Sequence, residues 1–285
     1  MRLFQTDHMN VYKYAPVLTI AGSDSGGGAG IQADIKTISS LGCYAASAIT
    51  AVTVQNTLGV SGIHAIPVDI VCAQVKAVMD DIQPVAIKIG MVHSKELALA
   101  LAATLQAYPQ VPIVLDPVMI STSGHKLIED ETIAILKERL FPLAAIITPN
   151  LDEAAVLCGR KLESVRDMEE AADELLQHGS KAVLLKGGHL PGEKVYDVYC
   201  EANGMLLALE APRIASNNVH GTGCTLSSAI ASYLALGNTL LESVMQAKAY
   251  IAKAIEEGKD VVVGNGSGPV NHFFDPIKLQ KYAVE

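Results

Sequence analysis

The chain alternates short, uniformly apolar runs with longer stretches of helical spacing, and this alternation limits the possible folds more than any other feature. The runs are rich in Val and Ile and lack the in-out alternation of a half-exposed strand, as expected for strands covered on both faces. They occur at 17–21, 48–54, 85–89, 113–116, 145–148 and 182–186. The pattern predicts right-handed β-α-β units and a mostly parallel sheet between two helix layers.

The rest of the chain fits the same three-layer αβα sandwich. Apolar spacing predicts helices and one antiparallel hairpin. The helices are expected at 71–82, 168–176, 222–236 and about 239–257, and the hairpin strands at 195–199 and 205–211. Because no linker-like segment, repeat or low-complexity tract interrupts the chain, we expect one domain over residues 15–285, preceded by an extension, residues 1–14.

Composition excludes several classes of function. Half of the 285 residues are hydrophobic and 18% are charged, which is typical of a compact soluble protein. The net charge of −9 is the wrong sign for a nucleic-acid surface. Five cysteines without a C-x-x-C pair and eight histidines without H-x-x-x-H spacing argue against a zinc site or a disulfide framework, and favour the reducing cytoplasm. No signal peptide and no apolar run of the roughly 20 residues that span a bilayer is found, so no membrane partner is expected.

A first glycine cluster has five glycines among the nine positions from Gly22 to Gly30, between a predicted strand and a predicted helix. A P-loop would require Lys-Ser/Thr directly after the last glycine, and that pair is missing. A G-x-G-x-x-A pattern is present at 28–33, but no Asp or Glu occurs between Asp34 and Asp69 to bind a dinucleotide ribose. The cluster is therefore either a tightly packed turn or a loop whose backbone closely approaches a small ligand.

A second glycine cluster reads Gly221-Thr222-Gly223-Cys224 and opens a helix of small residues. Free N–H groups and the positive end of the helix dipole would converge there, which predicts an anion site. The alternative is an ordinary helix start capped by the Thr222 side chain.

Polar residues at the ends of other predicted strands complete a pattern typical of phosphoryl transfer. Asn150 and Glu153 share one helix face, where their oxygens would hold Mg²⁺ directly or through water, or would instead form a capping box. Lys186 ends a buried strand and requires an anionic partner, for which a phosphate would serve. Asp116 is a further carboxylate at the same edge of the sheet.

Seven motifs, taken in order, resemble the hydroxymethylpyrimidine/phosphomethylpyrimidine kinases of thiamine biosynthesis, which belong to the ribokinase-like superfamily and are close to pyridoxal kinases. The resemblance runs from about Val17 to residue 274. The motifs are AGSDSGGGAGIQAD (21–34), VQNT (54–57), KIGM (88–91), LDPVM (115–119), TPNLDEA (148–154), LKGGH (185–189) and HGTGCTLSSA (220–229).

The resemblance implies a ribokinase-like fold, a homodimer, and ATP- and Mg²⁺-dependent phosphorylation of the pyrimidine's hydroxymethyl group and then of its monophosphate. It also implies roles for individual residues. The acceptor would lie near Gly22, Ala29, Asp34, Gln55, Met91 and Val118. The ATP phosphates would meet Asn150, Glu153, Lys186 and Thr222. Asp116 and Glu153 would hold Mg²⁺, partly through water. The catalytic group would comprise Gly221, Thr222, Gly223, Cys224 and Lys186.

The residue at position 224 separates the pyrimidine kinases from the sugar kinases of this fold, which have an aspartate base there. A helix N-terminus is expected to lower the pKa of the Cys224 thiol from its reference value of about 8.5. We expect Cys224 to assist the first transfer only, because the acceptor of the second is already anionic. A buried cysteine without chemical consequence is the alternative. For the whole chain, the alternatives are a pyridoxal kinase, a non-catalytic nucleotide sensor and, last, a dehydrogenase.

Overall fold

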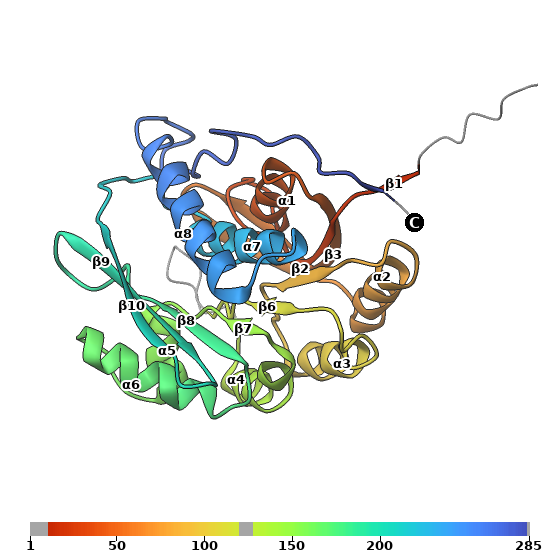
Figure 1. The fold of residues 1–285 in the computed structure, drawn as a ribbon, viewed down its shortest axis with the longest axis horizontal. Coiled ribbons are helices and arrows are strands. Elements are labelled where there is room, and N and C mark those ends of the chain that lie inside the picture. The colour runs from red at the N-terminus through yellow and green to blue at the C-terminus, as the bar shows by residue number, and fades with distance from the viewer. Residues whose placement is uncertain (1–10, 120–127, 284–285) are drawn as a thin grey trace, which may run out of the picture.

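The computed structural model describes residues 11–119 and 128–283, and its centre is a nine-stranded sheet with helices on both faces (Figure 1). The strand order is β10-β9-β8-β7-β6-β5-β2-β3-β4. The strands are β2 (Pro16–Asp24), β3 (Tyr44–Asn56), β4 (Gly59–Ala65), β5 (Ala86–Ile89), β6 (Ile113–Leu115), β7 (Ile146–Ile147), β8 (Ala182–Lys186), β9 (Lys194–Glu201) and β10 (Leu206–Pro212). The six strands from β8 to β3 in this order run parallel, and β4, β9 and β10 are antiparallel to their neighbours. The predicted, mostly parallel sheet is confirmed.

Helices cover both faces of this sheet, as the alternating sequence pattern predicts. One face carries α1 (Gly30–Ser40), α7 (Thr222–Ala235) and α8 (Leu240–Glu256), with Ile38, Ile230 and Val244 in its core. The other face carries α2 (Val68–Asp81), α3 (Lys95–Leu105), α4 (Asp130–Ile135), α5 (Leu151–Cys158) and α6 (Val165–Leu176), as Figure 1 shows. A π-helical turn (Leu136–Leu140) and a 3₁₀ turn (Phe141–Leu143) follow α4. No helix among the described residues is long and apolar enough to cross a membrane.

The core strands show why period-2 alternation is missing from the sequence. Every residue of β5, β6 and β7 is buried, and so are the first four of the five residues in β8. Strands covered by helices on both faces have no solvent side, so apolar residues occupy consecutive positions. The two cores thus lie on opposite faces of one sheet.

Two pairings of strands go beyond the sequence prediction. The strand predicted at 48–54 is longer in the structure, where β3 runs from Tyr44 to Asn56. It pairs with β4 through Ala51↔Ala65 and Asn56↔Gly59. The second pairing joins β1 (Tyr12–Lys13) to β11 (Tyr282–Ala283). Part of the predicted N-terminal extension is therefore bonded to the last residues of the described chain, while residues 1–10 lie outside the described residues.

The strand order changes direction at β2. The chain runs outward from β2 to β3 and β4, and then returns to the opposite side of β2 to build β5, β6, β7 and β8. Ligands of open α/β sheets bind beyond the carboxyl ends of the strands at such a switch point. The first glycine cluster, which begins in the last residues of β2, lies at this carboxyl end.

Candidate active site

The first glycine cluster is wrapped around its own carboxylate. Asp24 accepts hydrogen bonds from the backbone N–H groups of Gly26 at 2.8 Å, Gly28 at 3.0 Å and Ala29 at 2.8 Å. Burial opposes ionisation, but the contact with His220 and these N–H groups hold the pKa of Asp24 below its ordinary value. Because Asp24 already takes these donors, the loop is not a phosphate cradle, in agreement with the missing P-loop signature.

The two glycine clusters pack directly against each other. His220, which precedes the second cluster, places its Nε2 2.9 Å from Oδ2 of Asp24. A Cβ on Gly28 would lie 2.4 Å from the His220 ring, and a Cβ on Gly221 would lie 1.8 Å from the carbonyl oxygen of Gly28. Only residues without a side chain allow this approach, so the glycines of each cluster are required by the other. Neither Asp24 nor His220 was predicted as a site residue from the sequence, where they are 196 positions apart.

The start of α7 has the features of an anion site. Gly221 is the residue that caps the helix, with φ of 82°, and no side chain accepts from the first turn. The alternative of a Thr222 side-chain cap is therefore wrong, since Thr222 is the first helical residue. N–H groups of an uncapped first turn point out of the helix and carry the positive end of its dipole. An anion placed before this turn would be bound by both.

An ion pair between a buried carboxylate and a partly buried ammonium lies beside this turn. Nζ of Lys186, at the end of β8, is 2.8 Å from Oδ1 of Asp116, which also accepts from the Thr148 hydroxyl at 2.9 Å. A Cβ on Gly223 would lie 3.2 Å from Nζ of Lys186 and 3.4 Å from Oδ2 of Asp116, so the turn touches the pair. Burial disfavours both charges, but Lys186 and Lys88 hold the pKa of Asp116 below its ordinary value, and Asp116 chiefly raises that of Lys186.

Asn150 and Glu153 form the capping box that sequence analysis left open. Asn150 accepts from the Glu153 N–H at 2.8 Å, and the Glu153 carboxylate accepts from the Asn150 N–H at 2.7 Å. Glu153 is only 3% exposed, and burial raises its pKa to about 7 although Lys186 opposes the shift. Asn150 also pairs with Lys186 in an isolated parallel bridge, so the box lies beside the ion pair.

The residues present fit Mg²⁺ of the kind that nucleotides bring with them. No group of three or more His, Cys, Asp or Glu side chains that would hold a metal occurs in the described part of the chain. Mg²⁺ needs only one or two carboxylates when phosphates and water supply the other ligands. Asp116 and Glu153 are mutually close enough for the charge of Asp116 to raise the Glu153 pKa, and they flank Lys186.

Cys224 lies where two helices begin. Cys224 belongs to the first turn of α7, and the backbone of Gly30, the first residue of α1, favours its ionised form. The expectation that a helix N-terminus lowers the thiol pKa is wrong here. Burial raises the pKa of Cys224 to about 11, and this outweighs the opposing effects of Lys88 and the Gly30 backbone.

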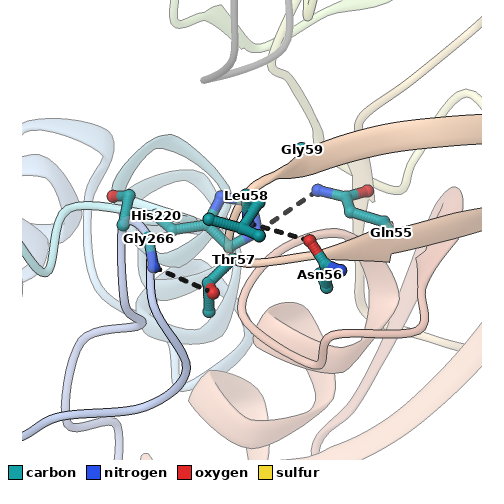
Figure 2. Close-up of a pocket in the computed structure, with 8 residues that line it drawn as sticks. Gln55, Asn56, Thr57, Leu58, Gly59, His220 and Gly266 are labelled. Atoms are coloured by element: carbon teal, nitrogen blue, oxygen red, sulfur yellow. Dashed lines mark hydrogen bonds between the residues drawn. The ribbon is translucent and has the colours of Figure 1, made fainter.

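The predicted acceptor residues lie around the end of β3 and the switch point. The Gln55 side chain projects toward His220, with 3.3 Å between their Nε2 atoms, and its Oε1 is 3.1 Å from the Thr53 hydroxyl (Figure 2). Gly22 faces Met91, whose Sδ would lie 3.3 Å from an added Cβ. Val118 lies two residues after Asp116 and is partly exposed.

A pocket of about 270 Å³ adjoins Gln55 (Figure 2). Its wall is formed by the β3–β4 turn and a glycine segment near the C-terminus, which are joined by bonds from the N–H groups of Gly266 and Ser267 to Thr57. The lining residues are Gln55, Asn56, Thr57, Leu58, Gly59, His220, Gly266 and Ser267. The sequence analysis singled out only Gln55 among them.

Asp34 is the predicted acceptor residue that lies away from open space. Its side chain has no exposed surface, and its carboxylate bonds Lys88, Thr19 and Ser228. The predicted contact with the substrate is not available in this arrangement. Asp34 instead lies beneath the first turns of α7.

The switch-point location, the uncapped helix start and the adjoining Lys186–Asp116 pair define a ribokinase-like small-molecule kinase. The phosphomethylpyrimidine kinase family model matches residues 24–271, and the chain belongs to this family. A hydroxymethylpyrimidine/phosphomethylpyrimidine kinase of Rhizobium meliloti is 48% identical over 260 residues, which cover 91% of this chain and 97% of that protein. The thiamine biosynthesis bifunctional protein ThiED of Geobacter sulfurreducens is 49% identical over 90% of this chain, but the chain spans about half (52%) of its length.

Solved structures agree with this assignment. The phosphomethylpyrimidine kinase of Clostridium difficile has a TM-score of 0.75 at 48% identity, with 84% of this chain and 99% of that chain covered. The pyridoxal kinase of Staphylococcus aureus in complex with pyridoxal has a TM-score of 0.84 at 33% identity, with 95% and 99% covered. The fold is thus shared with a phosphomethylpyrimidine kinase and with a pyridoxal kinase.

Proposed function

We propose that this chain transfers the γ-phosphoryl group of ATP to the hydroxymethyl oxygen of 4-amino-5-hydroxymethyl-2-methylpyrimidine, and then phosphorylates the monophosphate to the diphosphate. The observation that carries the proposal is the uncapped start of α7 in contact with the Lys186–Asp116 pair. Preorganised N–H donors and a buried cation stabilise the charge that spreads over the transferred phosphoryl group.

Most of the charged residues would act on the phosphate donor, ATP. The N–H groups from Gly221 to Cys224 and the Lys186 ammonium would bind the transferring phosphoryl group, with Thr222 beside them. Asn150 and Glu153 would border the ATP phosphates. Asp116 and Glu153 would hold Mg²⁺, in part through water, and the ion would neutralise charge on the phosphates.

The acceptor side would use the switch point and the end of β3. Gln55 offers both a donor and an acceptor to the aminopyrimidine edge. Gly22 and Ala29 present backbone close to the ring, while Met91 and Val118 supply apolar contacts. Asp34 acts from beneath the site rather than on the ring.

Cys224 is proposed to assist only the first transfer. A hydroxyl acceptor loses a proton, whereas the phosphate of the monophosphate is already anionic. Because the pKa of the thiol is about 11, the thiolate is scarce at neutral pH and becomes more abundant as the pH rises. The first transfer should therefore accelerate with rising pH more than the second.

A pyridoxal kinase activity is the second candidate, because pyridoxal kinases share the fold at a TM-score of 0.84. We also propose a homodimer, on the resemblance to the family, and a cytoplasmic location, which the five free cysteines favour.

Product analysis tests the proposal. Incubation of the protein with Mg²⁺, ATP and the hydroxymethylpyrimidine should yield the monophosphate and then the diphosphate, identified by mass spectrometry. Lys186→Met should remove both products. ATP hydrolysis without a phosphorylated pyrimidine would refute the proposed acceptor.

A further inference from the structure

A second buried ion pair, between Lys88 and Asp34, lies beneath the start of α7. Lys88 of β5 and Asp34 of α1 have side chains with no exposure at all, and Nζ lies 3.0 and 2.9 Å from the two carboxylate oxygens. Asp34 also accepts from the hydroxyls of Thr19 at 2.6 Å and Ser228 at 2.7 Å. Each oxygen of this carboxylate therefore has two donors.

These contacts connect the sheet to both helices that begin at the thiol. Thr19 belongs to β2, and Ser228 lies on α7 exactly four residues, about one turn, after Cys224. Asp34 lies one turn after Gly30, whose backbone acts on the Cys224 thiol. The carboxylate thus fixes α1 and α7 relative to each other one turn behind the point where they meet.

Lys88 brings a positive charge to the same place. Its field acts on Cys224 and on Asp116, and it favours the ionised form of both. A Cβ on Gly90 would lie only 2.7 Å from Nζ of Lys88, so the ammonium is packed against the backbone at the end of its own strand. Little room remains for the ammonium to move.

We infer that Asp34 and Lys88 are positioning residues for phosphoryl transfer, which hold the first turn of α7 in register with the Lys186–Asp116 pair. The inference rests on the proposed function and deepens it. Stability alone does not explain the pair, because a buried ion pair often stabilises a fold no more than apolar residues of similar volume. The pair would act on turnover through the elements it holds, since neither side chain has any exposed surface with which to contact a ligand.

The test uses a variant without a buried charge. Asp34→Asn with Lys88→Met keeps the approximate volumes, and the amide can accept from one of the Thr19 and Ser228 hydroxyls and donate to the other. Each single change would instead leave one charge unpaired. We expect the double variant to keep KM for ATP and for the pyrimidine within about threefold and to lose at least tenfold in kcat. The control removes an exposed pair, Lys194 and Glu210, as Lys194→Met with Glu210→Gln, and should leave both parameters unchanged.

A second readout does not depend on phosphoryl transfer. Alkylation of Cys224 by iodoacetamide, located by peptide mass spectrometry between pH 7 and 10, reports the surroundings of the thiol. The charged groups that act on it are Lys88, Asp34, Asp116 and Lys186. We expect the double variant to change the rate of alkylation at least threefold, and the control to leave it unchanged. If the wild-type protein phosphorylates no pyrimidine, the proposed function fails while this readout still tests the positioning.

Ser228→Ala removes a single hydrogen bond, to Asp34, and keeps the inference testable if the double variant does not fold. It should lower kcat about three- to tenfold at unchanged KM. Wild-type kcat in a folded double variant, a loss confined to KM, or wild-type kcat in Ser228→Ala would overturn the inference.

Discussion

Substitution of Gly221 by alanine is the sharpest test of how the two glycine clusters form one site. The added Cβ would lie 1.8 Å from the Gly28 carbonyl oxygen, and ordinary contact begins near 3.4 Å, so the clusters must separate by more than 1 Å. The left-handed φ of 82° costs a side chain about 1–2 kcal/mol, and overpacking costs a further 1–3 kcal/mol or so. We expect Tm to fall by roughly 5 to 15 °C. A misplacement of about 1 Å in the α7 turn should lower kcat roughly 100-fold.

Gly237→Ala is the matched control for the strain of the left-handed backbone without the steric clash. Gly237 follows the other end of α7 with φ of 89°, and an added Cβ there would have nothing within 4 Å. It should lower Tm by roughly 2 to 6 °C, from a cost of about 1–2 kcal/mol, and leave kcat unchanged. Thermal melting and steady-state kinetics would compare Tm and kcat of the two variants with those of the wild type. Equal melting shifts and wild-type kcat in Gly221→Ala would refute the reasoning.

Four further predictions follow from the same contacts. Lys186→Met should lower kcat by roughly 100- to 1,000-fold, because it removes a cation from the transition state and leaves Asp116 without its partner; steady-state kinetics with a loss below tenfold would contradict this. From pH 7 to 9.5, kcat of the first transfer should rise while kcat of the second stays constant, because the Cys224 thiolate becomes more abundant. Cys224→Ala should abolish the rise. Parallel pH profiles of the two transfers would contradict the proposed role of the thiol. Burial raises the pKa of Glu153 from 4.5 to about 7, so between these pH values the folded state retains a proton that the unfolded chain releases. Without Mg²⁺ and nucleotide, the contribution of Glu153 to stability therefore falls as the pH rises through that window. Glu153→Gln should remove this slope from a plot of Tm against pH, and an unchanged slope would contradict the raised pKa. Gln83 has φ of 55° at an exposed helix end, so Gln83→Gly should raise stability by about 0.5–1 kcal/mol with kcat unchanged, and a lower Tm would show that the turn is not strained.

The sheet could be predicted because its signals are local. A strand covered on both faces must be apolar throughout, and the predicted run at 182–186 coincides with β8. The edge strand β4 was missed because it is mostly exposed and contains two glycines, so that neither an apolar run nor a clear alternation marks it. Its position depends on pairing with β3, which no short window of sequence shows.

The candidate site could be predicted only in part. Gly221, Gly223 and Lys186 could be selected as candidates because a glycine turn before a helix and a lysine at the end of a buried strand each have a local physical meaning, and the structure brings the three together. The bond between Asp24 and His220 spans 196 positions, and only the folded chain brings the two together. The same holds for Asp34. Its motif suggested a ligand contact, whereas its four hydrogen bonds from Thr19, Lys88 and Ser228 place it beneath the site.

The proposed site transfers a phosphoryl group from ATP to the pyrimidine. The most direct measurement compares kcat/KM for the hydroxymethylpyrimidine, its monophosphate and pyridoxal in one assay with Mg²⁺ and ATP. We predict transfer to both pyrimidines, with pyridoxal at least 100-fold poorer than the hydroxymethylpyrimidine. A preference for pyridoxal, or transfer to neither pyrimidine, would contradict the account.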